Sequence, residues 1–188
     1  MISDEELVKR ALENNDCFGE IIDRYEKKLA RYLRRLTNLE EQDIEDLLQD
    51  VFIKIYRNLS SFDTSFSFSS WAYRITHNEA INCVRKRSGK TTVPLESDEE
   101  TTMNLIEILQ TKEDIKQHVL QKELASNLRI SLNKLPKKYK DVIILYYLED
   151  LDYSEISDIL QKPMGTIATL LSRAKNKFKD IAKKDKLI

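Results

Sequence analysis

Side chains suited to binding unpaired nucleic acid recur at helical intervals within residues 66–90 of the sequence. On a helix that begins near Trp71, steps of three, four and seven residues bring them to one face. The residues on or beside this face are Trp71, Arg74, Asn78, Asn82, Arg85 and Lys86. Aromatic rings stack on bases, amides hydrogen-bond base edges, and guanidinium groups neutralise phosphates. An ordinary amphipathic helix with a solvated charged face has the same pattern, so this helix alone does not establish nucleic-acid binding.

The stretch before this helix, residues 60–70 (SSFDTSFSFSS), is rich in serine and phenylalanine. A solvent-exposed linker has little use for Phe62, Phe66 and Phe68 so close together. We expect Phe62 to join the core, and the loop to help form a pocket for a ring such as a flipped base. The inward side of the following helix carries Ala72, Tyr73, Thr76, His77, Ala80 and Cys83. His77 is therefore expected to be structural.

A helix predicted over residues 43–59 has an unusual outer face. Its buried stripe consists of Ile44, Leu47, Leu48, Val51 and Ile55. The reverse face carries Asp46, Gln49, Asp50, Ile53 and Arg57. An apolar Ile53 among carboxylates indicates a protein partner with basic side chains and a small apolar hollow. A single exposed apolar residue without function is the alternative, since every protein surface has some.

Composition predicts an all-α protein. Of its 188 residues 41% are hydrophobic and 34% charged, and it has only three Gly and three Pro, which favours long solvated helices over a turn-rich β fold. The net charge of -1 argues against a uniformly basic nucleic-acid coat, although acidic and basic residues are strongly segregated along the chain.

The sequence contains few residues for catalysis or metal binding. Cys17 and Cys83 are far apart, only two histidines accompany them, and both thiols are expected to be buried. No GxGxxG, P-loop, HExxH or GxSxG motif occurs, so we expect no enzyme, catalytic residue, metal, cofactor or small-molecule substrate. The acidic start lacks an apolar signal segment and no apolar run has the length of a membrane span, which predicts a cytoplasmic protein.

Two small helical domains joined by an acidic linker fit this pattern best. We expect a first domain over residues 1–90, in which Ser3 and Glu6 form a capping box and a helix follows from about Cys17 to Arg35. Residues 91–117 are polar and acidic and are predicted to form the linker. A second domain is expected over residues 118–188.

The second domain ends in a helix-turn-helix pattern. A short helix over Tyr153 to Leu160, a turn and a long helix from Gly165 follow a helix that begins at Pro136. The outer face of the long helix, starting at Thr166, includes Ala168, Thr169, Ser172, Arg173, Asn176 and Lys179. Hydroxyl, amide and guanidinium groups can contact base edges in a major groove or phosphates, and the lysine-rich tail favours DNA. A plain helical hairpin is the alternative.

Three blocks, in this order, resemble an extracytoplasmic-function sigma factor of bacterial RNA polymerase, a branch of the sigma-70 family. DIEDLLQDVFIKIYRNLSSFD (Asp43 to Asp63) resembles the segment that grips the polymerase clamp helices. FSSWAYRITHNEAINCVRKR (Phe68 to Arg87) resembles the part that melts and reads the minus-ten element. LPKKYKDVIILYYLEDLDYSEISDILQKPMGTIATLLSRAKNKF (Leu135 to Phe178) resembles the domain that binds the minus-thirty-five duplex.

The resemblance implies a transcription-initiation factor whose partners are core polymerase, promoter DNA as duplex and single strand, and an anti-sigma factor that could hold it at the membrane. The residues implied to contact core polymerase are Asp46, Leu47, Gln49, Asp50 and Ile53. Those implied for minus-ten DNA are Phe66, Trp71, Arg74, Asn78, Arg85 and Lys86. Those implied for minus-thirty-five DNA are Thr166, Thr169, Ser172, Arg173 and Asn176.

The sequence departs from the family pattern at three positions. Ala168 and Leu170 stand where a Lys and an Arg are common, which predicts weaker or different minus-thirty-five recognition. Asn82 stands where an Asp is common. A free-standing helix-turn-helix regulator would explain the C-terminal hairpin but not the aromatic loop or acidic face. A helical adaptor would explain only the amphipathic helices.

Overall fold

The computed structural model describes residues 2–87, 105, 108, 121–185 and 187, and every regular element among them is helical, as predicted. The chain divides into two compact units, with the main boundary between Leu95 and Glu96. The predicted linker lies outside the described residues except at Leu105 and Ile108, and both of these side chains are fully buried.

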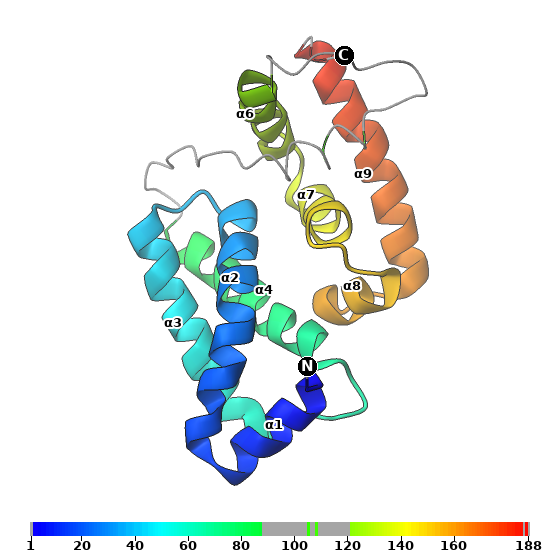
Figure 1. Cartoon of the computed structure of the whole chain (residues 1–188). Coiled ribbons are helices and arrows are strands. Elements are labelled where there is room, and N and C mark those ends of the chain that lie inside the picture. Colours follow the sequence, from blue (N-terminus) through cyan, green and yellow to red (C-terminus); the bar gives the residue numbers. More distant parts are fainter. Residues whose placement is uncertain (1, 88–104, 106–107, 109–120, 186, 188) are drawn as a thin grey trace. The chain divides into compact units, whose positions relative to one another are not determined.

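The first unit is a small bundle in which the long helices pack around a shared apolar core (Figure 1). Its helices are α1 (Asp4–Glu13), α2 (Phe18–Leu36), α3 (Glu41–Asn58) and α4 (Phe68–Lys86). Short 3-10 turns, η1 (Asn15–Cys17) and η2 (Leu59–Ser61), follow α1 and α3. Helix α4 packs against α1, α2 and α3, so neighbours surround much of its circumference.

Local signals fix where these helices begin and how they connect. The Ser3 side chain accepts a hydrogen bond from the Glu6 backbone N–H at 3.2 Å, which is one half of the predicted capping box, while the Glu6 carboxylate accepts from Arg10. Ser67 caps α4 in the same way, accepting from Ser70 N–H at 3.3 Å, so this helix starts earlier than the predicted position near Trp71. Such caps typically contribute about 1 kcal/mol each.

Ion pairs join helices of the first unit end to end. The Arg34 guanidinium donates to both oxygens of Glu41 across the turn from α2 to α3, with Nε···Oε2 at 2.9 Å, and this contact lowers the pKa of Glu41. Arg87, just past α4, pairs with Asp43 in the first turn of α3. Cys17 and Cys83 are free and partly exposed rather than buried as expected.

The predicted helix-turn-helix lies in the C-terminal part of the chain, which belongs to the second unit except for Asp158–Gln161. The elements of this part are α6 (Gln121–Asn133), α7 (Lys137–Ile143), the π-helical turn η3 (Ile144–Leu148), α8 (Tyr153–Leu160) and α9 (Met164–Lys184). Helix α9 runs alongside α6 and α7 (Figure 1). The sequence predicts one helix through Leu148, but the backbone widens at Ile144, whose carbonyl accepts from Glu149 N–H at 3.0 Å.

Both ends of α8 are defined by specific hydrogen bonds. Asp152 accepts from Glu155 N–H at 2.8 Å while Glu155 accepts from Asp152 N–H at 3.0 Å, which is a reciprocal capping box. At the other end Gln161 is left-handed, with φ 53°, and Lys162 N–H donates to the Ser157 carbonyl at 3.1 Å. This is the Schellman arrangement, which turns the chain toward α9.

Candidate functional site

A buried aromatic cluster anchors the loop before α4. The Phe62 ring lies 5.5 Å from Phe68 and 5.2 Å from Trp71, and Phe68 lies 5.6 Å from Trp71, measured between ring centroids. Phe62 belongs to the core, as predicted. Trp71 is only 8% exposed, so its ring packs in this cluster instead of lying on the open face to which helical spacing assigned it. The rings of Phe62 and Phe68 thus pack directly against the indole.

Phe66 takes the exposed aromatic position in this region, since 45% of its surface is accessible. A turn presents it: Phe66 N–H donates to the Asp63 carbonyl at 3.1 Å, and the Asp63 side chain accepts from Ser65 N–H at 2.9 Å. That hydrogen bond from Ser65 lowers the pKa of Asp63. An exposed ring beside buried rings provides a stacking surface for a base.

The polar face of α4 follows the sequence-based assignment beyond Trp71. Asn78, Arg85 and Lys86 are exposed, and Arg74 is half-buried. Opposite them, Ala72, Tyr73, Thr76 and Ala80 are buried, whereas Cys83 is only half-buried. His77 is buried on this packed side, where its Nδ1 lies 2.8 Å from the Tyr32 hydroxyl, so its predicted structural role is confirmed.

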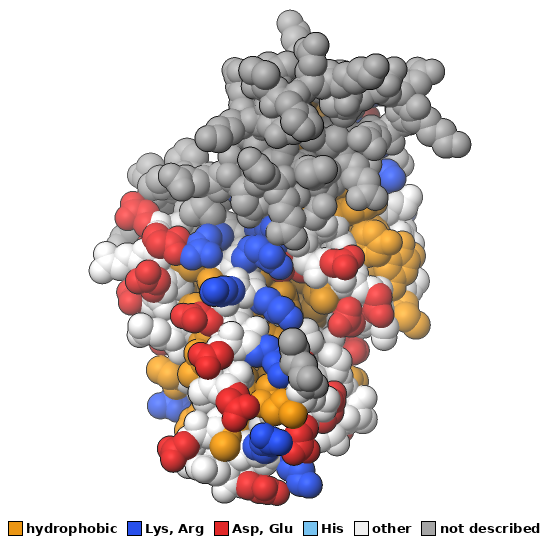
Figure 2. All heavy atoms as spheres, viewed as in Figure 1, with side chains coloured by type: hydrophobic (Ala, Val, Ile, Leu, Met, Phe, Trp, Pro, Cys, Tyr) orange, Lys and Arg blue, Asp and Glu red, His pale blue; other side chains and the backbone are white. Residues whose placement is uncertain are grey.

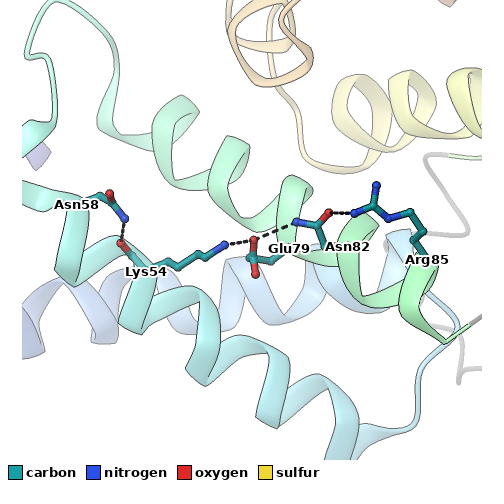
Figure 3. A network of polar contacts seen from close by, with 5 residues as sticks. All are labelled: Lys54, Asn58, Glu79, Asn82 and Arg85. Atoms are coloured by element: carbon teal, nitrogen blue, oxygen red, sulfur yellow. Dashed lines mark hydrogen bonds and ion pairs between the residues drawn. The ribbon is translucent and has the colours of Figure 1, made fainter.

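A chain of polar contacts connects α3 to this face of α4 (Figure 3). The Asn58 amide donates to the Lys54 carbonyl at 2.7 Å, and the Lys54 ammonium pairs with Glu79. Asn82 donates to Glu79 at 3.4 Å and accepts from Arg85 at 3.3 Å. The Asn82 amide can do both, whereas an ionised Asp at position 82 would lack the donor. The departure from the family pattern at Asn82 thus has a local cause.

An open groove of about 500 Å³ lies between α2 and α3. Its lining consists of Ile22, Glu26, Glu45, Leu48, Gln49, Phe52 and Ile53. Ile53 is 48% exposed, as the sequence predicts, and Asp46 and Asp50 are exposed on the adjacent strip of α3. Leu47 is buried, as its place on the apolar stripe with Val51 predicts, so it does not lie on the surface to which the family resemblance assigned it. Apolar side chains bordered by carboxylates suit a basic partner with an apolar side chain to insert.

Only Gln49 and Ile53 of the lining belong to the sequence-based set, and two of the missing residues, Ile22 and Glu26, lie on another helix. They come from α2 and lie four residues apart, at the edge of its buried stripe. Their spacing identifies a shared strip of helix surface, but only the packing of α2 against α3 reveals that this strip borders a groove. Figure 2 shows acidic side chains beside α3 and a band of Lys and Arg side chains over α2.

The outer face of α9 is as the sequence predicts. Thr166, Thr169, Ser172, Arg173 and Asn176 are all exposed. Their opposite side is buried through Ile167, Leu171, Ala174 and Phe178. Ala168 and Leu170 are half-buried at the edges of the face. A long helix with a polar exposed side, placed second in a helix-turn-helix, has the form of a DNA recognition helix.

Comparison with known proteins identifies the family. The family model "Sigma-70 region 2" matches residues 21–90, and "Sigma-70, region 4" matches residues 126–178. The ECF RNA polymerase sigma factor SigW of Bacillus subtilis is 35% identical over 166 residues, which are 86% of this chain and 87% of that protein. The chain belongs to the extracytoplasmic-function branch of the sigma-70 family. It is therefore a sigma factor, which directs bacterial RNA polymerase to promoters.

Other relatives of this sigma factor cover almost its whole length. The ECF RNA polymerase sigma-E factor of Escherichia coli is 28% identical over 179 residues, 93% of this chain and 91% of that protein. CnrH, solved in complex with the cytosolic domain of CnrY, superposes with a TM-score of 0.70 at 21% identity, covering 97% of this chain and 98% of that one.

RpoE of Bartonella quintana, solved with the anti-sigma factor NepR, gives a TM-score of 0.65 at 21% identity and covers 88% and 96% of the two chains. These two structural matches establish the shared fold. Within the described part of this sigma factor, no helix has the length and apolar character needed to cross a bilayer.

Proposed function

We propose that this sigma factor binds core polymerase through the groove between α2 and α3 and the acidic strip beside it. The observation that supports this assignment is an exposed Ile53 at an apolar groove whose rim carries Glu26 and Glu45. A basic helical partner would gain both apolar burial and charge complementarity there.

A charge-reversal variant tests the docking surface. Gln49→Ala combined with Asp50→Arg places a cation opposite the basic partner and is expected to weaken binding to core polymerase at least tenfold. Glu13→Arg, an equally exposed change at the end of α1, serves as the control and should bind like the wild type. Equal affinity of all three proteins in a pull-down titration would contradict this placement.

We further propose that the loop of Phe66 and the polar face of α4 capture single-stranded minus-ten DNA. The exposed Phe66 ring supports stacking, and Arg74, Asn78, Arg85 and Lys86 supply phosphate and base contacts. Promoter opening requires no catalysis, because the free energy of binding the extruded bases offsets the few kcal/mol per base that unstacking costs. Binding therefore selects the open state of the promoter duplex. Trp71 supports this site from within the core.

The exposed face of α9 is proposed to bind the minus-thirty-five duplex, with Thr166, Thr169, Ser172, Arg173 and Asn176 in the major groove. Arg173→Ala should weaken holoenzyme binding to a duplex promoter and reduce the slope of log K against log salt by about 0.9 if Arg173 contacts a phosphate. Arg10→Ala removes a cation from α1 and should leave the slope unchanged. The partly covered Ala168 and Leu170 contribute no cation, which fits weaker recognition.

A cytoplasmic location and control by an anti-sigma factor, which could hold the protein at the membrane, complete the proposal. Two relatives of the same fold were solved with such a partner or with a cytosolic domain bound. Reconstitution with bacterial core polymerase on a promoter library, scored by run-off transcription, tests the complete proposal. A free-standing helix-turn-helix regulator would bind duplex DNA but would neither bind core nor direct initiation.

A further inference from the structure

Helix α1 lies before the residues that the family model for region 2 matches, yet one of its carboxylates contacts Tyr25, whose ring packs on Phe68. Asp4, in the first turn of α1, accepts hydrogen bonds from two consecutive residues of α2. The Arg24 guanidinium donates to Oδ1 at 2.7 Å, and the Tyr25 hydroxyl donates to Oδ2. Asp4 and Arg24 are both only about a quarter exposed, so solvent screens this pair less than a surface pair.

Tyr25 connects Asp4 to the start of α4. Its ring meets Phe68 edge to face, with centroids 5.3 Å apart. Burial first, and then the hydrogen bond to Asp4, raise the pKa of the Tyr25 hydroxyl. The hydroxyl therefore stays protonated at physiological pH and remains a donor to Asp4.

The loop that carries Phe66 is held at both ends by rings of one cluster, Phe62 before it and Phe68 after it. Phe68 is also the first residue of α4, so any displacement of Phe68 moves this end of the loop relative to Phe62 at the other end. The Asp4–Tyr25 contact restricts such displacement, because it fixes the ring that packs on Phe68.

We infer that Asp4 is a positioning residue for base capture, acting through Tyr25 and Phe68 to hold the loop in the conformation that presents Phe66. The inference rests on the proposed role of this loop in binding a flipped base. It assigns a function in promoter opening to a helix outside the matched region 2.

Two variants remove the contact in different ways. Asp4→Ala deletes the acceptor, while Tyr25→Phe deletes only the hydroxyl and keeps the ring that packs on Phe68. Glu5→Gln, an exposed neighbour in the same helical turn, changes the same charge without touching Tyr25 and is the matched control. All proteins are tested as full chains assembled with bacterial core polymerase.

The probe is the single-stranded oligonucleotide that the wild-type holoenzyme selects from a random pool, together with versions carrying one abasic site. For the wild type, an abasic site at the captured position should weaken binding about tenfold, since one stacked base is lost. Asp4→Ala and Tyr25→Phe should bind the intact probe several-fold more weakly and the abasic probe as the wild type does. Glu5→Gln should match the wild type on both.

The intact and abasic probes separate positioning from general damage. Equal weakening on both probes would indicate a loss of folded protein and would overturn the inference, as would unchanged binding of the intact probe. If the wild type itself does not distinguish any abasic probe, the proposed base capture fails, and the inference fails with it.

Discussion

Helices α4 and α9 both carry a polar face predicted to bind DNA, but they differ in how fully helical spacing determines that face. On α9 all five predicted residues are exposed, whereas on α4 the aromatic member, Trp71, is buried. Helix α9 packs on α6 and α7, while α4 packs on α1, α2 and α3, and its Trp71 also packs against Phe62. Spacing alone therefore assigns faces reliably only where neighbours lie on one side.

The largest effect that should separate the two helices is on stability. Trp71→Ala is expected to lower the free energy of unfolding of the first unit by about 3–5 kcal/mol, because it leaves a cavity between Phe62 and Phe68. Thr169→Ala on α9 should change stability by less than about 0.5 kcal/mol. Urea denaturation checks both values. A Trp71→Ala protein as stable as the wild type would mean that the indole is not a core residue.

In the second unit a charged residue lies on the buried side of its helix, because Asp141 of α7 is buried. Burial raises its pKa to about 6, opposed by the charges of Lys137 and Lys140. Since this folded-state pKa lies above the unfolded value near 4, the folded state binds more protons between these pH values. This group therefore makes the protein less stable as pH rises from about 4 to 6, and the loss persists above 6.

Asp141→Asn should remove this pH-dependent loss. We expect the variant to gain up to about 3 kcal/mol over the wild type at pH 7, and a smaller or no advantage at pH 4. Denaturation midpoints measured from pH 4 to pH 7 give the difference directly. A difference that does not grow with pH would contradict the assignment to Asp141.

A third change concerns binding rather than stability. Phe66→Ala should weaken binding of the holoenzyme to single-stranded minus-ten DNA about tenfold, as expected for the loss of one stacking surface. It should change the unfolding free energy by less than about 0.5 kcal/mol, because Phe66 is exposed. Permanganate footprinting tests the effect on promoter DNA, and urea denaturation tests the effect on stability. Normal promoter melting would remove Phe66 from the site.

The smallest expected effect lies at the turn before α9. Gln161 occupies a left-handed conformation that costs a side-chain-bearing residue about 1 kcal/mol, so Gln161→Gly should stabilise the second unit by about 0.5–1 kcal/mol. Lys162→Gly, at the next position, should give no such gain. Thermal denaturation of the two variants and the wild type checks the difference, and equal shifts would argue against a strained turn.

The sequence predicts the helices and the exposed positions of α9 well, since a regular stripe of apolar residues determines both. It does not predict that Trp71 is inaccessible to a partner, because that depends on the packing of its ring against Phe62 and Phe68. Leu47 lies on the predicted apolar stripe of α3, and only the family resemblance assigned it to a partner. The position of Ile22 in the groove and the hydrogen bond between Tyr25 and Asp4 both depend on how separate helices pack. Such contacts have no signature in local spacing.

The buried position of Trp71 has a practical consequence, because it is the only tryptophan in the chain. Its fluorescence reports on the first unit alone, whereas far-ultraviolet circular dichroism follows the helices of both. Recording the two signals in one denaturation experiment would resolve two transitions that a single midpoint would merge. The intact protein thus carries an intrinsic label with which the stability of each half can be measured without cutting the chain.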